Sequence, residues 1–182
     1  MRRILVGQVL LILCCIVYLL WWYRGYRPNV SVDRFGGING ILFRLTAAAG
    51  ISGLIFSLGR FEEKTAAKLN GYAIAVIGVV ACIAMMLITR YGFGRIVTTE
   101  LILIAGWTVL ETTVINRLNA AGILSDNQFG VMCVVIAAAF TVSMILYVAY
   151  YRMEEMKAFY AAMIPLVTEA AAMAVLTGMM IL

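Results

Sequence analysis

The amino-acid sequence predicts an all-α membrane protein, a polytopic bundle of six transmembrane helices. Of its 182 residues, 64% are hydrophobic and only 13% are charged, whereas a soluble domain is about 45–50% apolar and about 25% charged. The apolar residues gather in six runs of roughly 20 residues, the length of helix that crosses a hydrocarbon core. These runs are continuous rather than alternating, which indicates helices and not the strands of a barrel.

The six spans follow one another with short connections, so we expect a single integral membrane domain over residues 1–182 and no soluble domain. The expected spans are residues 4–23, 41–58, 71–89, 97–116, 130–151 and 159–182. Three helices followed by three helices is the layout of the inverted repeats of small transporters. A 3+3 repeat is therefore a further expectation.

The first span follows two basic residues, as a signal peptide does, but it has no A-x-A cleavage site. It ends in Trp21-Trp22-Tyr23, an aromatic belt that indicates a retained membrane anchor. The connection after it carries Arg24, Arg27 and Arg34 beside a glycine-rich run. Backbone N–H groups of such a run can form an anion nest. This loop is predicted either to hold an anion such as a lipid headgroup or to anchor the chain at the interface.

The second span carries Arg44 near its start and a stripe of small residues at a spacing of four, Ala49, Gly53 and Ser57. Small residues at this spacing let helices approach closely, so the stripe predicts a packing face or a dimer face. A short polar segment, residues 60–70, leads to the third span. Its basic side chains at positions 60, 64 and 68 are typical of a helix end that faces headgroups.

The fourth span carries two acidic residues. Glu100, Trp107 and Glu111 are spaced by seven and four, which places them on one face of a helix. The second and fourth spans run in the same direction, so Arg44 and Glu100 have similar depths. They are predicted either to form an ion pair or to extend separately to the headgroups.

The fifth span ends in an aromatic belt of tyrosines, and the sixth contains Pro165 four residues before Glu169. The proline predicts a bend, and bent helices often border binding sites. Glu111 and Glu169 have depths that differ by only about 6 Å at 1.5 Å rise per residue. If their helices are neighbours, the two carboxyl groups are expected to share a polar pocket, and Gln8 on the first span can reach toward it. A carboxyl group inside the membrane is either a functional site or a polar contact between helices.

The composition excludes several function classes. The chain has no histidine, only two aspartates and four cysteines without a C-x-x-C pair, so we expect no metal site and no cofactor. The net charge is +5, but the basic residues lie at the ends of apolar runs, where they suit lipid phosphates rather than nucleic acid. Lys and Arg divide almost equally between the two sides of the membrane, which leaves the orientation open.

Three functions fit these features. The first is a transporter, permease or solute-binding subunit with a carboxylate-containing site between the second, fourth and sixth spans, where Gln8, Arg44, Glu100, Trp107, Glu111 and Glu169 bind a small molecule or an ion. The second is a membrane-embedded enzyme that acts on a lipid or isoprenoid, with Glu111 and Glu169 as acid and base. The third is an accessory subunit. Expected partners are membrane lipids and a homodimer or complex partner, in the plasma (inner) membrane if the protein is bacterial.

Overall fold

The computed structural model describes residues 2–28, 32–58, 66–94, 99–150 and 152–181, without the side chains of 99, 100 and 150. Within these residues the regular secondary structure is all α-helical, joined by turns and short loops. The helices are α1 (Arg2–Gly25), α2 (Gly37–Ser57), α3 (Gly71–Phe93), α4 (Thr99–Ala120), α5 (Asp126–Tyr150), α6 (Glu155–Ala161) and α7 (Ile164–Ile181). Within these residues, six helical segments are long and apolar enough to cross a membrane. The predicted fold class is confirmed, and the 3+3 repeat stays a prediction.

The sixth span is divided into two helices. It covers Glu155–Ile181, and its helix is interrupted between the end of α6 at Ala161 and the start of α7 at Ile164. Pro165 has no N–H group, so it cannot donate a helical hydrogen bond to the carbonyl group of Ala161. The bend that the proline predicts is therefore confirmed.

The fifth span begins earlier than expected, at Asp126 instead of residue 130. Ser125 and Gln128 form a capping box before it: the Gln128 side chain accepts a hydrogen bond from the Ser125 N–H at 3.0 Å, and the Gln128 N–H donates to the Ser125 hydroxyl at 3.3 Å. The helix therefore starts at this polar cap. The apolar run alone predicts a start one helical turn too late.

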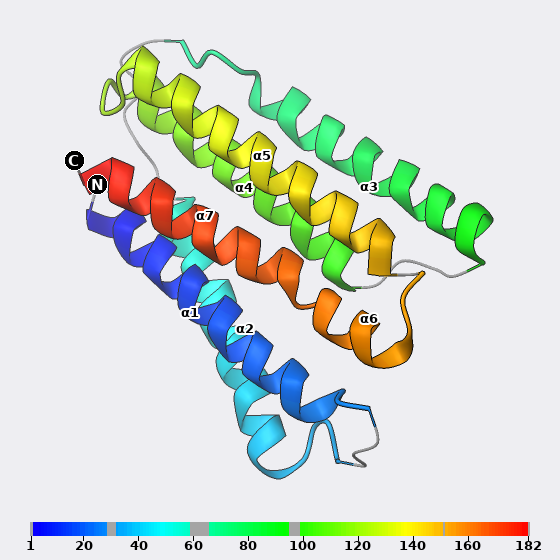
Figure 1. The fold of residues 1–182 in the computed structure, drawn as a ribbon. Helices are drawn as coiled ribbons and strands as arrows, with labels where there is room; N and C mark the ends of the chain where they lie inside the picture. The colour runs from blue at the N-terminus through cyan, green and yellow to red at the C-terminus, as the bar shows by residue number, and fades with distance from the viewer. Residues whose placement is uncertain (1, 29–31, 59–65, 95–98, 151, 182) are drawn as a thin grey trace.

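The helices are arranged as a hairpin, a central group and one peripheral helix (Figure 1). Helices α1 and α2 form the hairpin, and α7 packs between α1 and the pair α4–α5. Helix α3 lies on the far side of the bundle and packs mainly on α4. The start of α1 and the end of α7 lie at the same end of the bundle (Figure 1).

The main core lies where α1, α4, α5 and α7 meet. Its buried apolar residues include Leu11, Leu110, Ile115, Met132 and Met173. By contrast, Thr89 is the only buried residue among the described positions of α3. Most apolar side chains of α3 therefore face outward, as expected for a helix surrounded by lipid.

The two helices of the hairpin approach closely because small residues line their contact. A Cβ atom on Gly7 would lie 2.4 Å from the Ser57 hydroxyl oxygen, and one on Gly53 would lie 2.8 Å from Leu11. The small-residue stripe of the second span is thus a packing face between α1 and α2.

Candidate functional site

Glu111 of α4 is fully paired inside the bundle. The Gln8 side-chain nitrogen on α1 donates to Glu111 Oε1 at 2.9 Å and to Oε2 at 3.1 Å. Both side chains have 0% exposure. One amide group therefore supplies a hydrogen bond to each oxygen of a buried carboxyl group, which joins α1 to α4 across the core.

Glu169 of α7 has the same burial but different surroundings. The residue is 1% exposed, and its Oε1 has no hydrogen-bond partner among the described residues. It follows Pro165 by one turn of helix, so the break between α6 and α7 sets its position. Two cavities meet at this side chain.

The larger cavity has a volume of about 240 Å³. Helices α1, α2, α4 and α7 contribute its lining: Leu11, Cys14, Cys15, Gly50, Leu54, Ile102, Leu103, Gly106, Trp107, Leu110, Leu166, Glu169 and Met173. Leu54 and Ile102 are also exposed on the outer surface of the bundle. The cavity therefore opens sideways, between α2 and α4, toward the hydrocarbon of a surrounding bilayer.

Polar groups are few in this larger cavity. Besides Cys14 and Cys15, the residues with polar side chains in its described lining are Glu169 and Trp107. Trp107 is 7% exposed, and its Nε1 also lacks a hydrogen-bond partner among the described residues. An apolar space with one carboxyl group and one N–H donor suits a lipophilic molecule better than a hydrated ion.

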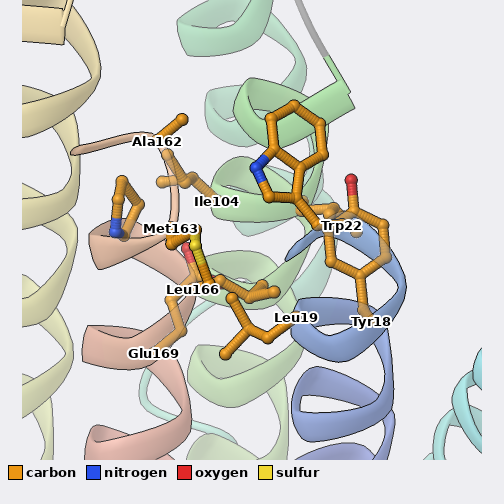
Figure 2. Close-up of a pocket in the computed structure, with 10 residues that line it drawn as sticks. Tyr18, Leu19, Trp22, Ile104, Ala162, Met163, Leu166 and Glu169 are labelled. Atoms are coloured by element: carbon orange, nitrogen blue, oxygen red, sulfur yellow. The ribbon is translucent and has the colours of Figure 1, made fainter. Parts of the chain in front are cut away.

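The smaller cavity, of about 10 Å³, lies on the other side of Glu169. Figure 2 shows the Glu169 carboxyl group entering it from α7 and the indole ring of Trp22 facing it from α1. The Trp22 Nε1 is buried and has no hydrogen-bond partner in the described part of the chain. Leu103, Leu166 and Glu169 line both cavities, so the two spaces adjoin at these three residues.

Three other predicted substrate-binding residues, Gln8, Arg44 and Glu111, line neither cavity. Glu111 lines neither cavity, so the structure places the two core carboxyl groups in separate surroundings. Arg44 is exposed on α2. The side chain of Glu100 lies outside the described residues, so its ion pair with Arg44 stays a prediction.

The three arginines of the first loop each face a different group. Arg24 Nε donates to Asn39 Oδ1 at 3.3 Å. The Arg34 guanidinium lies 4.4 Å from the centre of the Tyr26 ring, and that of Arg27 lies 5.6 Å from the Tyr23 ring. These contacts tie the loop to the aromatic belt. An anion site formed by the three arginines stays a prediction.

Sequence reasoning missed the role of two residues at the site. Trp22 was assigned to the aromatic belt alone, and Gly106 was not singled out. The sequence does contain a signal for Trp22. The end of the first span, which carries Trp22, and the start of the sixth span must lie on the same side of the membrane, so Trp22 can lie near the first turns of the sixth span. No comparable signal existed for Gly106, since its importance depends on the empty space beside it.

The length and composition of the six helices are those of a polytopic integral membrane protein. Compared with protein-family models, curated proteins and solved structures, the chain matches none. Among the residues that the structure describes, no group of three or more His, Cys, Asp or Glu side chains could hold a metal ion. Any function must therefore be argued from the cavity and its polar groups.

Proposed function

We propose that the protein is a transporter or a membrane solute-binding subunit that takes a lipophilic small molecule from the bilayer into the cavity around Glu169. If the protein is bacterial, that bilayer is the plasma membrane. The observation that carries this proposal is an apolar cavity of about 240 Å³ lined in part by Glu169, whose buried Oε1 has no hydrogen-bond partner among the described residues.

The energetics of the site support a ligand. A buried acceptor left without a partner costs about 1–3 kcal/mol, and a ligand that donates to Glu169 would recover that cost. Apolar cavities with a few converging polar groups are the usual form of a small-molecule site. The sideways opening at Leu54 and Ile102 suits a molecule that arrives through the hydrocarbon.

Binding is favoured over catalysis by the separation of the two carboxyl groups. An acid–base mechanism of the kind that the sequence allows needs two groups at the reacting atoms. Glu111 lines neither cavity and has both oxygens bonded to Gln8. Glu169 is thus the one carboxyl group available to a ligand in the described lining, and an enzyme acting on a lipid is the second candidate.

Filling the cavity tests the proposal. A Cβ atom added to Gly106 meets nothing within 4 Å, and Gly106 lines the cavity, so Gly106→Leu is chosen to fill it. Gly130 on α5 is equally open and lines neither cavity, which makes Gly130→Leu the matched control.

The measurement is photolabelling in liposomes with a decane chain that carries a diazirine, followed by peptide mass spectrometry. We expect the wild-type protein and Gly130→Leu to be labelled at residues 102–110, and Gly106→Leu to lose most of that labelling. Equal labelling of all three proteins would contradict the proposal. Recovery of a chemically altered lipid substrate would favour the enzyme instead.

A further inference from the structure

We propose that the ligand of this site is a lipophilic alcohol, with its hydroxyl group held between Glu169 and Trp22 and its apolar tail in the larger cavity. The inference rests on the proposed function, because it assigns a chemical class to the molecule that occupies the cavity around Glu169. It follows from the sizes of the two cavities and from the donors and acceptors at their junction.

The volume of the smaller cavity limits the head group of the ligand to one small polar group. The cavity between Trp22 and Glu169 has a volume of about 10 Å³, near the lower limit for holding one water molecule. A phosphate or a carboxylate does not fit such a space. The adjoining cavity of about 240 Å³ is lined almost entirely by apolar side chains, which suits a hydrocarbon tail.

A head group that both donates and accepts fits the hydrogen-bonding groups at the junction. Within the described part of the chain, neither the buried Glu169 Oε1 nor the buried Trp22 Nε1 donor has a hydrogen-bond partner. An indole N–H can only donate, whereas a hydroxyl group offers one donor and two acceptor lone pairs. One hydroxyl group therefore offers an acceptor for the Trp22 N–H and a donor for the Glu169 oxygen.

A primary amine fits the same pair less well. An ammonium group has three donors and no acceptor, so it would leave the Trp22 N–H without a partner. It would also place two charges in an apolar cavity, where loss of hydration offsets much of their attraction. Lys and Arg are absent from the described lining of both cavities, so the site has no other charge to balance.

A single water molecule has the same hydroxyl chemistry as an alcohol, and the experiment must separate the two. We would compare three diazirine probes with the same ten-carbon chain: decane, 1-decanol and decylamine, each at the same mole fraction in liposomes. Trp22→Phe removes the donor and keeps an aromatic ring. Trp21→Phe is the matched control, because the Trp21 Nε1 already donates to the Arg34 carbonyl oxygen at 2.9 Å and Trp21 lines neither cavity.

We expect the decanol probe to label the residue 102–110 segment about tenfold more efficiently than the other two probes, the factor that corresponds to about 1.4 kcal/mol of hydrogen bonding. Trp22→Phe should reduce this preference to near unity, and Trp21→Phe should keep it. Stronger labelling by the amine would overturn the inference and leave the proposed function standing. So would equal labelling by decane and decanol, the result expected if water alone fills the small cavity. Absence of labelling by every probe would overturn the proposed function itself.

Discussion

Glu111 and Glu169 are two glutamates with nearly identical burial and opposite surroundings. They lie on neighbouring core helices, at 0% and 1% exposure. Glu111 has a hydrogen bond from Gln8 to each of its oxygens, and it lines neither of the two cavities at Glu169. Glu169 has an oxygen without a partner in the described part of the chain and borders both cavities. Burial of an acidic residue in a membrane therefore does not identify a binding site by itself. Whether its oxygens have hydrogen-bond partners within the protein distinguishes a structural contact from a group that can bind a ligand.

The largest expected effect on stability comes from replacing Glu111, the glutamate that is hydrogen-bonded to Gln8. Glu111→Leu leaves the buried amide of Gln8 without its acceptor, which should lower the free energy of unfolding by about 1–3 kcal/mol. Thermal unfolding in a mild detergent measures it. Glu111→Gln is the control, because its carbonyl oxygen still accepts from Gln8 and most of the stability should remain. A Glu111→Leu protein as stable as the wild type would contradict the structural role.

An intermediate effect should follow when both partners are removed together. Replacing both groups by apolar ones leaves no unsatisfied polar atom, so Gln8→Leu combined with Glu111→Leu should be more stable than Glu111→Leu alone. Interhelical hydrogen bonds in membranes give coupling free energies of about 0.6 kcal/mol on average and up to about 1.7 kcal/mol. A double-mutant cycle of unfolding midpoints measures this coupling, and strictly additive effects would show that the contact carries no energy.

The smallest effect on stability is expected from replacing Glu169. Glu169→Leu removes a buried oxygen that has no partner among the described residues, so the free energy of unfolding should stay the same or rise by up to about 1 kcal/mol. Photolabelling of the cavity by the decanol probe should fall in the same protein. Destabilisation as large as that of Glu111→Leu would show that Glu169 has a structural partner, and the contrast between the two residues would disappear.

The fold could be predicted from the sequence because hydrocarbon imposes a simple rule. Continuous apolar runs of span length must be helices, and Pro165 marks the interruption between α6 and α7. Helix ends were less predictable where polar caps extend a helix beyond its apolar run. The capping box of Ser125 and Gln128 is the clearest case.

The candidate site could be predicted only in part, because it depends on which helices are neighbours. Depth counting predicts that Gln8 reaches a pocket shared by both carboxyl groups, whereas in the structure Gln8 binds Glu111, and neither residue lines the cavities at Glu169. The same counting placed Glu111 and Glu169 at similar depths but could not reveal that they face different surroundings. Whether an oxygen is paired depends on rotation of the helices and on side-chain packing, and neither is encoded in the depth of a single residue.

The low apolarity of helix α4 affects how this helix inserts into the membrane during biosynthesis. Of the six candidate spans it is the least apolar and the most buried, and it carries Glu111 in its second half. Acidic residues disfavour the partitioning of an isolated helix from the translocon into lipid. Its neighbours along the chain, α3 and α5, are both much more apolar. We expect α4 to insert efficiently only when these flanking spans are present, so a truncation that ends after α4 should leave this helix partly outside the bilayer.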